Sequence, residues 1–385
     1  MKEGWEYKKL GEICQSDLGK TLNKSKDKGE LYPYLCAINI LWDKIDLSTL
    51  KQTRFEKDEL ERYSVKKGDL LICEGGDIGR AAIWDKEESM LYQNALHRVR
   101  LENNVNARFC LFFLQNLKQK GILDNRYGKG VTIKHLVKSA LLSIPIPVPP
   151  LSEQLHIVEE LDLLSSIIEK KKAQLIELDN LAQSLFYEMF GDPITNDKGW
   201  EVKKLGKLCI TSSGGTPSKT HKEYYEGGNI PWLRSGEVAQ GYIYHTEMHI
   251  TEEGLNNSSA KYFPINTVVV AMYGATVGQV GILKSRMTTN QAICGIFPSE
   301  SFVPTFLMFF LKGMKPVYLK DAAGGAQPNI SQGVIKNTLV PIVSIDLQNQ
   351  FASKIEVIEH QKELIKQSIK EVETLFNSRM DYYFN

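Results

Sequence analysis

The chain has 385 residues, of which 42% are hydrophobic and 24% are charged, and its formal net charge is +1. A chain of this length can bury two cores, and it has neither an apolar run of about 20 residues nor an apolar N-terminal segment, which argues against a membrane span and a secretory signal. Its six cysteines are isolated, so we expect reduced core thiols, no metal ligands and a cytoplasmic location.

The charge is distributed unevenly along the chain. Lys and Arg outnumber Asp and Glu in residues 1–150 and 191–345, whereas the acids outnumber the bases in residues 151–190 and 346–385. Alternating basic and acidic blocks indicate that these parts differ in their partners. The basic excess is modest, so by itself it supports nucleic-acid binding only weakly.

The same sequence pattern occurs twice. GWEYKKLG at residues 4–11 returns as GWEVKKLG at residues 199–206, and later matches keep nearly the same offset. These later matches pair residues 76–80 with 274–279, 93–95 with 290–292, 112–114 with 309–311, 144–146 with 340–342, and 151–154 with 347–350. Residues 20–62 and 215–262 share almost nothing. A tandem duplication with repeated motifs and divergent loops predicts one scaffold that presents two different recognition surfaces.

Each copy begins with a segment typical of a β-rich domain. Short apolar runs at residues 70–73 and 268–271 are bounded by glycines and predict strands. Apolar helices are expected near residues 107–118 and 304–313. The Pro-rich strings at residues 144–150 and 340–342 then predict extended connectors that lead out of each domain.

A helix of about 40 residues is expected after each connector. Apolar side chains recur there at steps of three and four, in a heptad pattern interrupted by a long cation such as Lys171, Lys362 or Arg379. The packing positions are Leu161, Leu164, Ile168, Leu175, Leu178, Leu185, Ile355, Ile358, Ile365, Ile369, Val372 and Phe376. Ser152 and Asp346 are candidate N-caps, and Gly191 begins the stop of the first helix.

One such helix could simply pack on its own domain, but two equally long stripes favour helix pairing, and an intervening domain favours an antiparallel pair. The sequence therefore predicts an α+β protein in which two pseudo-repeated globular domains are separated by two long antiparallel coiled-coil helices. The expected boundaries are residues 1–150 for the first domain, 151–190 for the first spacer helix, 191–345 for the second domain and 346–385 for the second helix.

Ordered motifs in both copies carry a family resemblance. They are the WxxKKLG strings at residues 5–11 and 200–206, PPLSEQ at 149–154, SGGTPS at 213–218 and IPW at 230–232. With them the chain resembles the specificity subunit of type I restriction–modification systems, over residues 4 to about 380. The first copy departs from the pattern, because it has DLGKT at residues 17–21 where the second has the SGGTPS string.

The resemblance implies a non-catalytic subunit that selects a bipartite, asymmetric DNA site, with one target-recognition domain for each half-site. It implies that two methyltransferase subunits dock on the helices and methylate adenine with S-adenosylmethionine, and that restriction and motor subunits join some complexes. The chain itself would then need no cofactor or metal, and the length of its helices would set the spacer between the half-sites.

Candidate DNA contacts are polar side chains near glycine-rich loops. Lys suits phosphate, whereas Arg, Gln and Asn can pair with base edges; a solvated surface side chain is the alternative for each position. The first domain offers Lys20, Lys24, Lys26, Lys28, Arg80, Lys129 and Lys134. The second offers Thr216, Ser218, Lys219, Lys222, Gln279, Gln327, Asn329 and Ser331.

Two other functions are open to test. A metal-dependent nuclease could use Asp192, Glu201 and Lys203, although the first copy has no upstream acid to match Asp192. A purely structural coiled-coil protein would bind no DNA. Methyl transfer by the chain itself is disfavoured, because we find neither a G-x-G loop after a strand nor an Asp/Asn-Pro-Pro-aromatic string.

Overall fold

The computed structural model of the chain describes residues 5–23, 27–322 and 328–385. By its internal contacts the chain divides into two units, unit 1 with residues 1–172 and 368–385 and unit 2 with residues 173–367. Both divisions fall inside long helices, so each unit holds one globular domain and one segment of each helix. The two units are described in turn.

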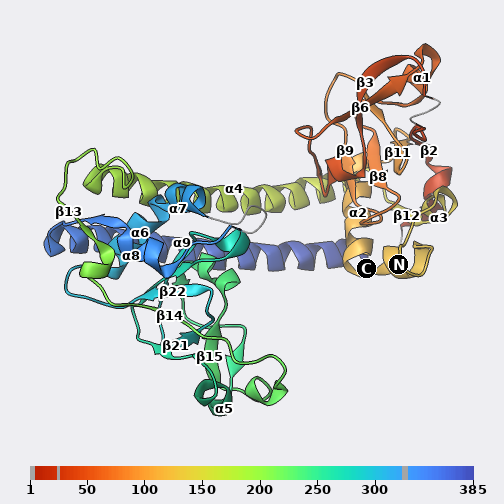
Figure 1. Cartoon of the computed structure of the whole chain (residues 1–385). Helices are drawn as coiled ribbons and strands as arrows, with labels where there is room; N and C mark the ends of the chain where they lie inside the picture. The colour runs from red at the N-terminus through yellow and green to blue at the C-terminus, as the bar shows by residue number, and fades with distance from the viewer. Residues whose placement is uncertain (1–4, 24–26, 323–327) are drawn as a thin grey trace. The chain divides into compact units, whose positions relative to one another are not determined.

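The first globular domain has two four-stranded sheets (Figure 1). One has the order β2 (Cys14–Leu18), β11 (Leu96–Leu101), β8 (Leu70–Cys73) and β9 (Ala81–Ile83), and all its pairs are antiparallel. The other has the order β6 (Lys51–Phe55), β3 (Glu30–Leu35), β10 (Met90–Tyr92) and β7 (Ser64–Val65). Every residue of β8 is buried, as its unbroken apolar run predicts.

Shorter elements complete this domain. They are a two-stranded ladder of β1 (Glu6–Lys9) and β12 (Pro145–Val148), a hairpin of β4 (Ile40–Leu41) and β5 (Lys44–Ile45), and the helices α1 (Lys57–Arg62), α2 (Ala107–Gln119) and α3 (Lys138–Leu142). The Asn106 side chain caps α2 by accepting hydrogen bonds from the amides of Arg108 and Phe109. Because β1 and β12 pair, the first and last segments of the copy lie side by side.

The second globular domain repeats this plan. Its five-stranded sheet has the order β14 (Thr211–Ser213), β22 (Ile293–Ile296), β19 (Val268–Ala271), β20 (Val280–Leu283) and β16 (Tyr242–Ile243). Its four-stranded sheet has the order β17 (His249–Ile250), β15 (Ile230–Leu233), β21 (Met287–Thr289) and β18 (Tyr262–Phe263). The ladder of β13 (Val202–Lys204) with β23 (Leu339–Pro341) closes it, and its helices are α5 (Glu252–Asn256), α6 (Pro304–Gly313), α7 (Lys315–Asp321) and α8 (Gln332–Asn337).

The duplication read from the sequence is repeated in individual hydrogen bonds. The amide of Gly19 donates to the Leu96 carbonyl, and the amide of Gly214 donates to the Ile293 carbonyl. Both domains also share a parallel pair at the same place, since β10 runs parallel to β3 and β21 runs parallel to β15. The second domain has a further parallel pair, β16 with β20. The frame of the two copies is therefore the same at the level of backbone register.

The two long helices are α4 (Leu151–Phe190) and α9 (Ile345–Phe384). In unit 1 the first part of α4 meets the last part of α9, where Arg379 Nη2 donates to Glu160 Oε2 at 2.8 Å. In unit 2 the last part of α4 meets the first part of α9, where Lys362 Nζ donates to Asp179 Oδ1 at 2.7 Å. These pairings run in opposite senses along the two helices, so the predicted antiparallel pairing and the α+β fold class are confirmed.

The packing positions predicted on these helices are all buried or half-buried. The sequence patterns did not predict the aromatic packing near the end of α4, where the ring of Phe186 contacts those of Phe190, Phe306, Phe309 and Phe351. The predicted N-caps are wrong, because Ser152 and Asp346 lie inside the first turns of their helices. Instead, the Pro150 carbonyl accepts hydrogen bonds from backbone amides in the first turn of α4, and the Ser344 side chain accepts one in the first turn of α9. Gly191 ends α4 at φ +82°, as predicted.

A buried glutamine joins each globular domain to its long helix. Gln154 accepts from the Asn106 amide at 2.8 Å and donates to the carbonyls of Asn104 and Pro149. Gln348 accepts from the Val303 amide at 2.8 Å and donates to the carbonyls of Ser301 and Val343. Both side chains are fully buried and make three hydrogen bonds to backbone groups. The second copy thus reproduces the joint of the first.

Candidate nucleic-acid interface

Glycine-rich turns place Arg80 and Gln279 at equivalent points of the two domains. Gly79 at φ +79° and Gly278 at φ +76° occupy the left-handed region, which a side chain would resist. Their amides donate to the carbonyls of Cys73 and Ala271, so each turn closes onto a buried strand. Arg80 is half-buried and its Nη2 donates to the Ala37 carbonyl at 2.8 Å, whereas the half-buried Gln279 has no such bond among the described residues.

Lys20, predicted as a phosphate contact, points into the protein. Lys20 is 5% exposed, and its ammonium lies 2.5 Å from Glu59 Oε2 and 2.9 Å from the Arg54 carbonyl. Asp27 provides a second carboxylate at 3.6 Å. This ammonium is already neutralised in the interior, so Lys20 holds α1 and β6 against the first loop and does not present a charge to solvent.

The second domain has glycine where the first has Lys20. The amides of Lys20 and Gly215 donate to Tyr92 and Thr289, which are themselves equivalent residues in the register of the two parallel strand pairs. A Cβ on Gly215 would lie 2.2 Å from the Ala260 amide nitrogen, so no side chain fits. The same backbone position therefore carries an internal cation in one domain and direct backbone packing in the other.

Three predicted residues of the second domain line one open cavity of about 460 Å³. They are Thr216, Lys219 and Lys222, and the rest of the lining is Tyr225, Glu226, Trp232, Arg234, Met248, Asn290 and Gln291. The Thr216 hydroxyl donates to Gln291 Oε1, and the indole of Trp232 donates to the Gly215 carbonyl at 2.9 Å. Ser218, by contrast, is exposed and pairs with Thr220 at 2.8 Å. This cavity combines cations, amides and aromatic faces, which suits a nucleic acid.

In the first domain a groove of about 490 Å³ contains one predicted residue, Lys129. Its lining also includes Lys9, Arg126, Tyr127, Ser139, Ala140, Ser143 and Pro145. Sequence reasoning missed Lys9, which it treated as part of the repeated frame, and Arg126. Lys134 is only half-exposed, since its ammonium donates to the Asp124 carbonyl at 2.8 Å. Three cations and no carboxylate line this groove, which makes it a candidate phosphate-binding surface.

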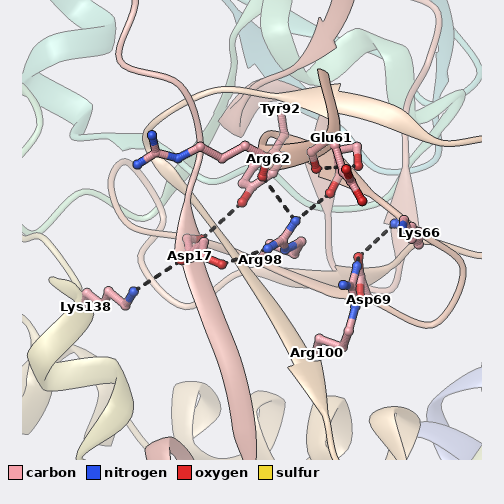
Figure 2. A network of polar contacts seen from close by, with 10 residues as sticks. Asp17, Glu61, Arg62, Lys66, Asp69, Tyr92, Arg98, Arg100 and Lys138 are labelled. Atoms are coloured by element: carbon pink, nitrogen blue, oxygen red, sulfur yellow. Dashed lines mark hydrogen bonds and ion pairs between the residues drawn. The ribbon is translucent and has the colours of Figure 1, made fainter. Parts of the chain in front are cut away.

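Strand β11 carries two arginines that belong to a partly buried network of polar contacts (Figure 2). Arg98 pairs with Asp17 at 2.7 Å and donates to the Ser64 carbonyl, and Arg100 makes two 2.7 Å hydrogen bonds to Asp69. Asp69 is 1% exposed, and its hydrogen bonds raise the pKa of Arg100 further. These cations are committed to the fold, so their charge does not count toward a free DNA-facing surface.

The remaining predicted contacts occupy varied places. Lys28 and Asn329 are exposed, and Asn329 forms an isolated bridge with Tyr273. Ser331 caps α8, because its hydroxyl accepts from the Val334 amide at 3.3 Å. Lys24, Lys26 and Gln327 lie outside the described residues.

The residues of the alternative nuclease site are engaged in local structure. Asp192 accepts from the Ile194 amide at 2.7 Å, and Glu201 pairs with Lys203 at 3.1 Å on the surface. Within the described residues no group of three or more His, Cys, Asp or Glu side chains is placed to hold a metal ion. The same part of the chain has no helix long and apolar enough to cross a membrane.

Comparisons with known proteins agree with this two-copy arrangement. The family model described as "Type I restriction modification DNA specificity domain" matches twice, at residues 2–178 and 197–374. The MjaIX specificity subunit of Methanocaldococcus jannaschii is 32% identical over 193 residues, which cover 49% of this chain and 44% of that protein. The putative MjaX specificity subunit of the same organism is 24% identical over 96% of this chain and 90% of its own length.

Solved structures share the fold over the whole chain. A chain from a study of complex assembly and conformational transition of the type I R-M system has a TM-score of 0.63 and 17% identity, and the match covers 100% of this chain and 98% of that one. The S subunit of a type I restriction–modification system from M. genitalium has a TM-score of 0.55 and 14% identity, with coverage of 99% and 96%.

Proposed function

The chain belongs to the family of type I restriction modification DNA specificity domains, and from that premise we propose that its two globular domains each read one half of a bipartite, asymmetric DNA site. Members of this family recognise DNA and are not the catalytic subunits, so the chain is a recognition subunit. The observation that carries the proposal is that two domains with one hydrogen-bonded frame present different polar cavities.

The cavities assign chemistry to each half-site. In the first domain, the groove with Lys9, Arg126 and Lys129 is suited to the phosphate backbone, with no carboxylate to oppose it. In the second, Lys219 and Lys222 can hold phosphates while the amide groups of Asn290 and Gln291 reach base edges. The guanidinium of Arg234 is already paired with Glu247. Since phosphates carry no sequence information, the two domains would differ in specificity through their non-lysine contacts.

The long helices offer outward faces for protein partners. Large apolar side chains remain exposed on them, among them Leu163 at 62%, Ile176 at 62%, Val357 at 59% and Leu364 at 53%. Such uncovered side chains along a helix mark a docking surface. We propose that two adenine methyltransferase subunits bind there, that S-adenosylmethionine is bound by those subunits, and that restriction and motor subunits can join. The free cysteines are typical of a reducing compartment and support a cytoplasmic location for this assembly.

The helix pair would set the spacing between the half-sites. Forty residues of α-helix are on the order of 60 Å long, enough to bridge major grooves one turn apart. Inserting one heptad in residues 160–185 with its complement in α9 should change the tolerated spacer and leave both half-site sequences unchanged. Methylome sequencing that showed altered half-sites would contradict this modular arrangement.

Domain exchange is the direct test of the proposed function. Replacing residues 20–145 with the matching segment of a relative should alter one half of the methylated motif and preserve the other, as read by genome-wide mapping of methylated adenine. The purified chain, alone or with its methyltransferase subunit, should also retain DNA with a strong dependence on salt. A structural coiled-coil protein would show neither result. A nuclease would cleave DNA with Mg²⁺ and lose this activity in Glu201→Ala.

A further inference from the structure

The hairpin at residues 128–135 presents two uncovered aliphatic side chains. Val131 is 100% exposed and Ile133 is 65% exposed, at the tip of a turn in the first domain. Single exposed apolar residues are common, but two close neighbours at the end of a projecting turn form a surface that water solvates poorly. They contribute nothing to the core of the domain, so their position calls for a partner outside this chain.

The hairpin is a built structure. Lys129 and His135 exchange backbone hydrogen bonds of 2.9 and 2.8 Å, which close the turn. Gly130 has φ +114°, and a Cβ there would lie 2.2 Å from the Ile133 carbonyl oxygen, so the turn requires glycine. At its base, Lys134 Nζ donates to the Asp124 carbonyl, and the buried Leu136 places its carbonyl 2.7 Å from Nε2 of His97. The base of the hairpin is therefore held in a defined position.

The charge beside the tip specifies an anionic partner. Lys129 belongs both to the hairpin and to the groove that Lys9 and Arg126 also line, so the two features form one surface. No carboxylate lines the groove, and within the described residues none of these three cations is ion-paired. The exposed hydroxyl of Ser139 adds a further hydrogen-bond donor, whereas that of Ser143 already donates to the Ala140 carbonyl at 2.7 Å. A polyanion with apolar faces at its centre fits this combination, and DNA is such a molecule.

We propose that the hairpin is a DNA-reading probe in which Val131 and Ile133 contact bases while Lys9, Arg126 and Lys129 bind the phosphates beside them. The apolar tip supplies contacts with base faces or thymine methyl groups, and the cations supply affinity that does not depend on sequence. This inference rests on the proposed function, because it names the element by which the first domain reads its half-site.

The first experiment separates the two parts of the probe. The full chain is titrated with a duplex carrying its methylated motif and with a scrambled duplex, over a range of salt concentrations. The double variant Val131→Thr with Ile133→Thr keeps the β-branched shape and should weaken binding to the motif about tenfold. Its binding to the scrambled duplex and its salt dependence should not change. The control Ile210→Thr, at a side chain that is 71% exposed in the second domain, should bind as the wild type does.

The cations should give the opposite signature. Changing Lys9, Arg126 and Lys129 together to Gln should weaken binding to both duplexes. It should also reduce the slope of log affinity against log salt by about 0.9 for each phosphate that the variant no longer neutralises. A slope that stays unchanged would show that the groove does not bind the DNA backbone.

A crosslinking experiment gives a positive readout. Five of the six native cysteines are buried, and burial raises the pKa of the half-buried Cys14 to about 11, so their background reactivity is low. Val131→Cys should attack a base-tethered mixed disulfide in the motif, release its small thiol and leave the protein linked to the DNA. Ile210→Cys is the matched control and should not be captured.

The outcomes distinguish this inference from the function on which it rests. If the wild-type chain and its complex show no salt-dependent DNA binding, the proposed function fails. If they bind DNA while the threonine variant binds equally well and Val131→Cys is not captured, the hairpin does not read bases. If the threonine variant instead no longer binds the methyltransferase subunit while its DNA affinity is unchanged, the tip is a protein contact and the inference is overturned.

Discussion

The two globular domains use the same backbone frame for different internal purposes. At one equivalent position, Lys20 reaches two carboxylates inside the first domain, and Gly215 lets two backbone segments touch in the second. At another, Arg80 is tied to the Ala37 carbonyl and Gln279 is not tied among the described residues. The register that holds these positions is the same in both. Divergence therefore reached residues that support the loops as well as residues on their surface.

This comparison also distinguishes the number of basic residues from the number whose charge is free to meet a ligand. Arg98, Arg100 and Lys20 are paired within the first domain, whereas Lys9, Arg126 and Lys129 line a groove without carboxylates. A count of basic residues along the chain cannot distinguish these two groups. The open cavity of the second domain is also lined by three cations, Lys219, Lys222 and Arg234, but Arg234 is paired with Glu247 and the carboxylate of Glu226 shares the lining.

The largest effect is expected where the helices meet the second domain. Phe186 is 1% exposed and contacts four other phenylalanine rings, so Phe186→Ala should lower the free energy of unfolding by about 4 kcal/mol. The matched change in unit 1 is Phe376→Ala, at 8% exposure with Phe112 as a ring partner at 6.1 Å. It should cost about 1 kcal/mol less. Urea denaturation measures both, and a larger loss in Phe376→Ala would reverse the ranking of the two helix ends.

Gly215→Ala tests the backbone packing of the second domain. Its Cβ would meet the Ala260 nitrogen and the Ser259 carbonyl carbon at 2.2 Å, both of which are backbone atoms, so we expect a loss of about 3 kcal/mol. Hydrogen exchange should localise the loosening to this domain. The control is Gly236→Ala, where no atom lies within 4 Å of the added Cβ. A loss below about 1 kcal/mol in Gly215→Ala would show that the loop can shift to accept a side chain. Glycine would then not be required at the position that Lys20 occupies in the first domain.

Lys20→Met should separate stability from DNA binding in the first domain. It removes the ammonium but keeps an apolar stem, leaving Glu59 and Asp27 facing each other unpaired at a loss of about 2 kcal/mol. The salt dependence of DNA binding should not change, because this charge is internal. Lys28→Met, at an exposed position, should leave stability within about 0.5 kcal/mol. A reduced salt slope in Lys20→Met would return that residue to the phosphate contacts.

The smallest effect is a pH dependence confined to unit 1. Hydrogen bonds from Arg379 and then Tyr383 hold the pKa of Glu160 below its usual range, against the opposing effect of its partial burial. A lowered carboxyl pKa contributes stability above the ordinary value near 4.3, and this stability is lost as the pH falls through the folded-state value. Wild type and Glu160→Gln should therefore converge in thermal stability on acidification. Glu373→Gln, which breaks an exposed 3.1 Å pair with Lys172, should show little of this behaviour.

The fold could be predicted because its signals are local and are written twice. The buried runs of β8 and β19, the glycine turns and the stripes of α4 and α9 each depend on neighbouring residues along the chain. The surroundings of the candidate contacts were harder to predict, and the role of these residues in DNA binding stays a prediction. Whether Lys20 is free depends on Glu59, 39 residues away in sequence, and the contribution of Lys9 depends on a groove that includes Arg126 and Ser143. Such partners are set by tertiary structure, which a single sequence does not report.

The repeat also contains a signal for the two joints, which the sequence predictions did not include. The sequence match of residues 151–154 with 347–350 pairs Gln154 with Gln350, and the structure shifts this register by two residues, so that Gln348 is the equivalent of Gln154. Neighbouring polar residues differ in this part of the chain. A polar side chain kept at one place in both copies, just inside an apolar helix, indicates a buried hydrogen-bonding role. The structure shows that role at both joints.

These glutamines have a consequence for how new targets arise. Every partner of Gln154 and Gln348 is a main-chain amide or carbonyl, so neither joint depends on which side chains the attached domain carries. A domain from another protein could make the same hydrogen bonds to Gln154 or Gln348, provided that its helix equivalent to α2 or α6 begins at the same position. Under the proposed function, one recombination event would then give a lineage a different half-site, while the proposed methyltransferase subunits continue to meet an unaltered pair of helices.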